Sequence, residues 1–169
     1  LGLQLGLAGG GGAATLYGMW FDGSNDTVLV DGSSFNAKTT GKITGVFQTA
    51  STGVVCVCAA TDETDISADV RINVRLGKFN FAVRDGGSLS PSLSVSSGAS
   101  YNDGLAHTFE VKVTDSGHFL TVDGVLLEAS GLTYHTGSAS NHYWFSDVNN
   151  VDAWAIGVRQ ESTPDNKFL

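Results

Sequence analysis

The most regular pattern of apolar and polar residues lies between residues 108 and 114, where apolar side chains at the odd positions alternate with charged ones. A period of two is typical of a strand that buries one face and exposes the other. A Ser116-Gly117 turn follows and, as a two-residue loop, pairs Val113 with Leu120, so that the apolar faces coincide. A second turn at Asp123-Gly124 carries the strongest short hairpin signal and begins a third strand. This stretch therefore predicts a three-stranded antiparallel meander.

A second hairpin is predicted over residues 69–84. Apolar residues alternate with polar ones on both sides of Gly77-Lys78, and a two-residue loop there sets Leu76 opposite Phe79. The polar face of this hairpin carries three of the nine cationic residues of the chain, Arg71, Arg75 and Arg84. We interpret it as a solvated face first and as a ligand-binding face second.

Shorter runs complete an all-β pattern. Strands are expected at residues 17–31 (two short strands around a turn), 42–49, 54–60 and 153–158. Residues 85–102 are expected to form a loop with one weak strand, which Pro91 places at a sheet edge. Residues 131–150 are expected to form a long loop. The expected core includes Phe109, Val111, Leu120, Val122, Ile72, Val74, Phe81 and Trp154.

The chain has two cysteines, Cys56 and Cys58, which lie two residues apart in an apolar run. An extended backbone points both thiols to the same face of a sheet, and a disulfide between them would be strained. A Cys-x-Cys pair without further cysteines or a nearby histidine is a poor metal site. We therefore interpret both residues as small buried hydrophobic side chains.

Length and glycine content indicate one domain preceded by an arm. A chain of 169 residues suffices for one β-sandwich with its own core, which we assign to residues 15–169. Residues 1–14 form a Gly/Leu-rich arm in which leucines alternate with glycine or glutamine like a small added strand, at Leu1, Leu3, Leu5 and Leu7. Four glycines at 9–12 cannot hold themselves in place, because ordering glycine costs the most backbone entropy. The arm is therefore expected to dock on a neighbouring subunit or a capsid surface.

Two motifs flank the strands of the meander. The first strand is entered by D-G-x-x-H and the second closes on V-D-G, with the residues Asp103, Gly104, His107, Val122, Asp123 and Gly124. Near the start, an F-D-G-x-x-D-x-V pattern is matched by Asp22, Gly23, Asp26 and Val28. These motifs resemble the laminin-G-like, concanavalin A-like lectin family. The resemblance implies an antiparallel two-sheet jelly-roll sandwich.

In that family the chain continues after its last inner strand into a final strand that pairs beside the first one. Here the sequence ends at Leu169, so the sandwich is expected to lack its final strand or to have that edge filled by another segment or subunit. An open edge invites such pairing, and the N-terminal arm of a neighbour is one candidate.

The same resemblance implies a Ca²⁺ site. Its expected ligands are the carboxylates of Asp22 and Asp26 near the first turn, together with oxygens of the closing loop near Asp147 and Asp152. The alternative is that these side chains only hydrogen-bond the local backbone, as Asp and Asn in turns usually do.

The loop expected at residues 131–150 is rich in aromatic rings and amides. Rings stack on sugar faces and amides bond hydroxyl groups, so glycan binding is predicted at Tyr134, His142, Tyr143 and Trp144. The alternative for the large rings, Trp144 in particular, is that they fill the core.

Charge and hydropathy exclude two classes of partner. The net charge of −8, from 17 acidic and 9 basic residues, repels phosphate backbones, so nucleic-acid binding is not expected. The sequence has no run of about 18 apolar residues, so no membrane span is expected.

Catalytic motifs are also lacking. A glycosidase needs two carboxylates flanking the scissile bond, and the nearest candidate, Glu63-Thr64-Asp65, has no flanking alternating strand and no second Glu at the needed offset. The protein is therefore predicted not to be an enzyme.

Two non-enzymatic functions follow from the resemblance. The first is a virion structural protein, a capsid decoration (cement) or tail component, whose lectin-like sandwich contacts host-surface glycans. The alternative is a secreted bacterial carbohydrate-binding or adhesion module. The expected location is the virion or, for the alternative, the extracellular space, and the expected partner of the arm is a virion protein or a second copy of the chain.

Overall fold

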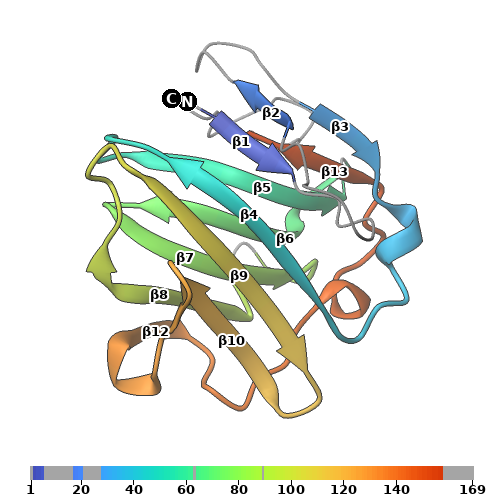
Figure 1. The fold of residues 1–169 in the computed structure, drawn as a ribbon. Helices are drawn as coiled ribbons and strands as arrows, with labels where there is room; N and C mark the ends of the chain where they lie inside the picture. The colour runs from blue at the N-terminus through green and yellow to red at the C-terminus, as the bar shows by residue number, and fades with distance from the viewer. Residues whose placement is uncertain (1, 6–16, 21–27, 63, 89, 158–169) are drawn as a thin grey trace, which may run out of the picture.

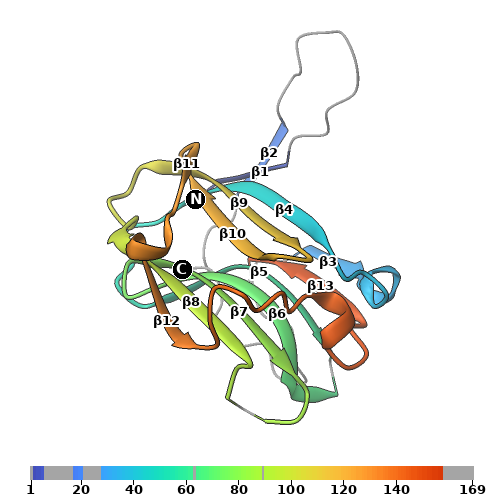
Figure 2. The ribbon, with the colours of Figure 1, turned by 90° about the horizontal axis from the view of Figure 1, so that it is seen from below.

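The computed structural model describes residues 2–5, 17–20, 28–62, 64–88 and 90–157, and it has an all-β fold (Figure 1). Two large antiparallel sheets pack face to face, as a second view shows (Figure 2). The helical segments in this described part are short 3-10 turns, η1 (Ser33–Phe35), η2 (Ala129–Gly131) and η3 (Phe145–Asp147). None of the described helical segments is long and apolar enough to cross a membrane. The predicted two-sheet sandwich is confirmed.

The larger sheet has seven strands. Their order across the sheet is β12 (Leu132–Thr136), β8 (Leu93–Ser100), β7 (Lys78–Asp85), β6 (Asp65–Arg75), β5 (Val54–Asp62), β13 (Ala153–Ile156) and β3 (Val28–Asp31). Every neighbouring pair is antiparallel. Because β3 pairs with β13, an early strand of the domain lies beside a late one.

The smaller sheet has four strands. Their order is β11 (Val125–Leu126), β10 (Gly117–Val122), β9 (Ala106–Thr114) and β4 (Gly41–Gln48). A two-stranded sheet joins β1 (Gly2–Leu5) to β2 (Tyr17–Trp20), and β1 lies close to β4. The strand of the N-terminal arm therefore contacts its own domain.

The core lies between the two large sheets, where alternate side chains of both sheets meet. The expected core residues Phe109, Val111, Leu120, Val122, Ile72, Val74 and Phe81 are all buried. Trp154 is half-buried and packs against them. Aromatic contacts join the sheets, since the ring centroid of Phe79 lies 5.7 Å from that of Phe47 and 5.5 Å from that of Phe109.

The β6–β7 hairpin forms, but its loop lies one residue earlier than predicted. Val74 pairs with Phe79, so the predicted pairing of Leu76 with Phe79 is wrong. The loop is Leu76-Gly77, and both residues have left-handed backbone angles, φ 50° and 77°. These angles are those of a type I′ turn, which matches the twist of the flanking strands.

The β9–β10 hairpin differs from the prediction in the same way. Val111, not Val113, lies opposite Leu120, so the loop is Asp115-Ser116. The hydroxyl of Thr114 accepts a hydrogen bond from the backbone N–H of Ser116 at 3.3 Å and supports this turn. A register change of two residues keeps every side chain on its face, which is why the core prediction holds in both hairpins.

Three further elements differ in extent or position. The turn at Asp123-Gly124 pairs Val122 with Val125 as predicted, but β11 is only two residues long. Residues expected in the long loop form β12, which pairs with β8. Strand β8 therefore lies inside the sheet, and Pro91 precedes it, where a missing N–H breaks no ladder.

The two cysteines face opposite sides of the seven-stranded sheet, contrary to the prediction. Cys56 pairs with Asn73 and Cys58 with Ile72, which are adjacent residues of β6 and so point to opposite faces. A β-bulge at Val57 inserts the residue that changes the parity of β5. Both thiols are buried as predicted, and burial raises the pKa of Cys58 to about 12.

Candidate functional site

The four residues of the predicted glycan-binding loop lie in different surroundings. Trp144 is 2% exposed and belongs to the core. Tyr134 is half-buried on β12, and its hydroxyl lies 3.2 Å from Nε2 of His118 on β10. Tyr143 is half-buried against the core, whereas His142 is exposed. The burial of Trp144 fits the alternative that it fills the core, and glycan binding by the loop stays a prediction.

The predicted calcium ligands fall partly outside the described residues, because Asp22 and Asp26 lie there. The carboxylate of Asp147 accepts a hydrogen bond from the backbone N–H of Trp144 at 2.9 Å, as a cap of η3. Asp152 is half-buried. In the part of the chain that the structure describes, no three His, Cys, Asp or Glu side chains gather as a metal site. Calcium binding therefore also stays a prediction.

The outward side of the seven-stranded sheet carries polar side chains on neighbouring central strands, and we call it the polar face. It consists of Thr61 on β5, Asp69, Arg71 and Asn73 on β6, Asn80 and Arg84 on β7, Ser94 and Ser96 on β8, and His135 on β12. These positions alternate with core residues such as Ile72 and Phe81, so the side chains point away from the core. Arg71 lies between Ala59 and Ala82 of the neighbouring strands.

A buried carboxylate anchors the cations of the polar face. Asp69 is fully buried, and its two oxygens accept hydrogen bonds from Arg84, at 3.1 Å from Nε and 2.5 Å from Nη2. Nη1 of Arg71 approaches the same carboxylate at 3.5 Å. A bidentate pair of this kind fixes the positions of both side chains. Arg71 keeps 21% of its side chain exposed, so it is the anchored cation that a ligand reaches.

Three buried atoms of the polar face have no hydrogen-bond partner in the described structure: Nε of Arg71, Oδ1 of Asn73 and Oγ1 of Thr61. Buried polar atoms are nearly always hydrogen-bonded, and an unsatisfied one costs about 1–3 kcal/mol. Together they comprise one donor, one acceptor and one hydroxyl that can act as either.

A pocket of about 190 Å³ lies at the end of the polar face near the β6–β7 turn. It is lined by Arg75, Leu76, Lys78, Asn80, Ser96 and His135. Nε2 of His135 lies 3.0 Å from the hydroxyl of Ser96, and Nδ2 of Asn80 donates to a backbone carbonyl of β8 at 2.9 Å. The polar face therefore extends from the anchored Arg71 to a pocket with two cations.

The sequence analysis placed the polar residues of the β6–β7 hairpin on its outer face, Asn73 and Asn80 included, but missed Ser94, Ser96 and His135. The usable signal was their parity, because each occupies a position that alternates with the apolar residues of its strand. For β8 that signal is weak, since its serine-rich composition taken alone favours a loop. Because residues 131–150 were expected to form a loop, the sequence analysis also gave His135 no position on a sheet.

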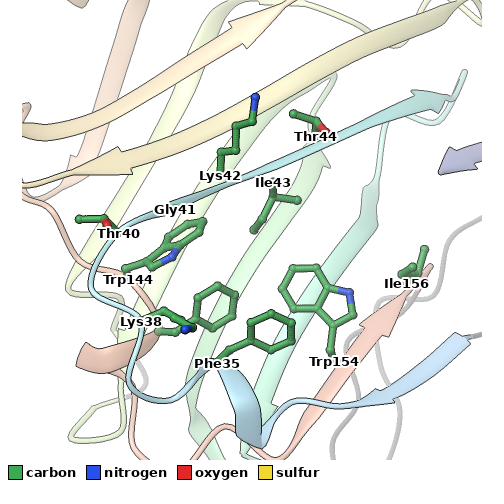
Figure 3. Close-up of a pocket in the computed structure, with 11 residues that line it drawn as sticks. Phe35, Lys38, Thr40, Gly41, Lys42, Ile43, Thr44, Trp144, Trp154 and Ile156 are labelled. Atoms are coloured by element: carbon green, nitrogen blue, oxygen red, sulfur yellow. The ribbon is translucent and has the colours of Figure 1, made fainter. Parts of the chain in front are cut away.

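A larger hollow of about 500 Å³, the apolar groove, lies between β4 and β13 (Figure 3). Its apolar lining consists of Phe35, Ile43, Trp144, Phe145, Trp154 and Ile156, and its other lining residues are Lys38, Thr40, Gly41, Lys42 and Thr44. The ring centroid of Phe35 lies 5.2 Å from that of Phe145 and 5.7 Å from that of Trp154. Aromatic side chains of three separate segments thus form one continuous wall.

Two carboxylates at the rejected catalytic motif, Asp65 within it and Asp62 just before it, have local hydrogen-bond partners. Oδ1 of Asp62 accepts hydrogen bonds from the backbone and hydroxyl of Thr64 at 2.8 and 2.7 Å. The hydroxyl and backbone N–H of Ser67 hold the pKa of Asp65 below its usual value. An ionised carboxylate with these partners is a poor general acid.

Comparison with known proteins finds similarity at the level of structure. No protein-family model matches the chain, and no curated protein sequence matches it. The carbohydrate-binding module CBM40 of the Ruminococcus gnavus IT-sialidase, solved with alpha2,3 sialyllactose, superposes with a TM-score of 0.60 at 13% identity, over 76% of this chain and 67% of that one. The fold is a concanavalin A-like jelly roll. The predicted resemblance is confirmed.

Laminin domains share this jelly roll. Domains LG4-5 of the mouse laminin alpha1 chain give a TM-score of 0.53 at 17% identity, over 79% of this chain and 32% of that one. The LG1-3 region of the laminin alpha2 chain gives a TM-score of 0.56 at 17% identity, over 92% of this chain and 25% of that one. The jelly roll thus spans about a third and a quarter of these laminin chains.

Proposed function

We propose that this jelly roll is a non-enzymatic carbohydrate-binding module that holds a glycan on its polar face. The observation that carries the proposal is the group of unsatisfied atoms on Arg71, Asn73 and Thr61, which lie together on the outward side of one sheet. Rigid strands position these side chains, and a site on strands is more precise than one on loops.

The chemistry of a sugar matches this face. A hydroxyl group both donates and accepts hydrogen bonds, and the three unsatisfied atoms call for both. Arg71 stands between Ala59 and Ala82 and keeps 21% of its side chain exposed, where a sugar hydroxyl can reach it. His135 and Ser96 continue the row of polar groups toward the pocket.

The structural neighbours support the same function without establishing it. One of them is named as a carbohydrate-binding module and was solved with a bound oligosaccharide. The others are laminin LG domains.

The proposal includes the setting of the module. We favour a virion structural role, as a capsid decoration or tail component that contacts host-surface glycans, with a secreted bacterial adhesion module as the alternative. The Leu/Gly pattern of the arm supports an assembly role, through Leu1, Leu3, Leu5 and Leu7. Deleting residues 1–14 should leave a folded domain that no longer joins its assembly, whereas normal incorporation of the truncated chain would contradict the assembly role.

A glycan array tests the binding function. We expect the full chain to retain a defined set of glycans, and Arg71→Gln and His135→Ala to weaken that binding. Lys112→Gln is the matched control, because Lys112 is exposed on β9 in the other sheet. An empty array at high protein concentration, or variants of the polar face that bind as well as the control, would contradict the proposal.

A further inference from the structure

We propose that the apolar groove between β4 and β13 is a second binding site, for a small amphiphile with an apolar body and an anionic head, such as a medium-chain carboxylate. This site is independent of the proposed glycan site. The groove opens between the two sheets, whereas the polar face lies on the outward side of the seven-stranded sheet.

The size and lining of the groove fit a small apolar body. Its volume of about 500 Å³ lies in the range of small-molecule sites, which are mostly apolar with a few placed polar groups. Phe35, Ile43 and Trp154 are only half-buried although they pack against the core. An apolar ligand would remove their remaining surface from water.

The groove is also preorganised. Ring contacts hold its aromatic wall together, with centroids 4.8 Å apart for Trp144 and Phe145 and 5.7 Å apart for Phe145 and Trp154. The backbone N–H of Ser146 donates to the carbonyl of Lys38 at 3.0 Å, which ties the segment before β4 to the turn that carries these rings. A ligand therefore enters a largely formed site.

Charge selects an anionic head. Lys38 and Lys42 are the charged residues among those that line the groove, in a chain with 17 acidic and 9 basic residues. Lys42 bonds Glu110 at 3.2 Å, which leaves Lys38 as the cation that a head group would meet. Figure 3 shows Lys38 at the edge of the aromatic wall, on the side of Trp144 and Phe35.

Other occupants are alternatives that the test separates. Strand β4 is at the edge of the four-stranded sheet in the described part of the chain, and β1 of the same chain lies close to it, so a strand from a second copy that takes the place of β1 is the main competitor. A second copy would bury the groove in a dimer and exclude the amphiphile.

The test is a titration of the full chain with dodecanoate below its micelle concentration. Binding is measured by calorimetry and by the change in tryptophan emission. Trp144 and Trp154 line the groove, and the chain has three tryptophans. We expect saturable binding to one site, and weaker binding of the uncharged dodecanol. Charge reversal in Lys38→Glu should weaken the affinity for dodecanoate about fivefold to tenfold.

The matched control is Val125→Glu, which adds an exposed negative charge on β11, at the edge of the four-stranded sheet opposite β4, and should leave the affinity unchanged. Ile43→Trp, which fills the groove, should abolish binding of both ligands while the melting transition stays cooperative. Absence of saturable binding, equal affinities for Lys38→Glu and the control, or a dimer that excludes dodecanoate would each overturn the proposal. Glycan binding by Lys38→Glu should be unaffected, so failure here is separable from failure of the glycan proposal.

Discussion

Nδ1 of His107 lies 2.8 Å from Oδ2 of Asp123 and so joins the start of β9 to the turn after β10. Nε2 of the same ring lies 3.0 Å from Oδ1 of Asp103. The other oxygen of Asp123 accepts the backbone N–H of Thr108 at 2.9 Å. One imidazole therefore links the D-G-x-x-H motif to the V-D-G motif, which gives both motifs a structural role.

The His107 link predicts a pH-dependent stability. Burial lowers the pKa of His107, but the hydrogen bonds and charges of Asp123 and Asp103 outweigh it, so the pKa lies above its ordinary value of 6.5. A raised folded-state pKa means that the stabilisation is fully present below pH 6.5 and is lost as the pH rises through the folded-state pKa. The melting temperature of the wild type relative to His107→Gln should therefore be higher at about pH 6 than at about pH 8.

The comparison with His107→Gln isolates this residue from His118. Burial lowers the pKa of His118 below 6.5, so its contribution falls as the pH decreases, but it is present in both proteins and cancels. A difference in melting temperature that does not change with pH would contradict the role of the His107 link.

Truncation of Leu120 should destabilise the sandwich. Its side chain is fully buried in the core, so Leu120→Ala should lower the free energy of unfolding by about 2–5 kcal/mol, through lost burial and a cavity. Urea unfolding measures this change. Leu105→Ala is the control, because Leu105 is 63% exposed, and a loss as large as that of Leu120→Ala would show that exposure does not govern the effect.

Replacement of Leu76 should stabilise the β6–β7 turn. Leu76 has φ 50°, a left-handed conformation that disfavours leucine, and it is 72% exposed. Asparagine followed by Gly77 is the preferred pair for this turn type, so Leu76→Asn should raise the free energy of unfolding by about 1 kcal/mol. Leu105→Asn, at an exposed position without a left-handed φ, should give no comparable gain. Equal effects of the two substitutions would contradict the assignment of the turn.

Removal of the Thr61 hydroxyl should also stabilise the protein in the absence of ligand. Thr61 is 1% exposed and its Oγ1 has no partner among the described residues, so Thr61→Val should raise the free energy of unfolding by about 1 kcal/mol. Thr49 is equally buried, but its hydroxyl accepts the backbone N–H of Ser51 at 3.0 Å. Thr49→Val should therefore lower the free energy of unfolding. If it raised that free energy instead, burial of the hydroxyl and not its missing partner would explain the effect of both substitutions.

The calcium hypothesis makes a separate prediction. If Asp22 and Asp26 bind Ca²⁺ with oxygens near Asp147 and Asp152, the melting temperature should be higher in excess calcium than in chelator, because a ligand of the native state stabilises it by mass action. Equal melting temperatures would contradict the site.

The sequence by itself determined which side of β6, β7, β9 and β10 faces the core. Parity along a strand depends only on the local backbone, so the alternations in β6, β7, β9 and β10 identified the core even though both hairpin loops lie one residue earlier than predicted. The exact position of a hairpin loop is harder to predict from sequence. Leu76 adopts a left-handed φ, which is unfavourable for leucine and which the sequence pattern did not indicate.

Only the tertiary structure decided which residues share a surface. Cys56 and Cys58 face opposite sides because a bulge in β5 depends on pairing with β6. The polar face combines β5 to β8 with β12, and the unsatisfied atoms of Arg71 and Asn73 can be recognised only once every neighbouring strand is in place. Hydrogen-bond satisfaction is a property of the assembled sheet, whereas burial parity is a property of a single strand.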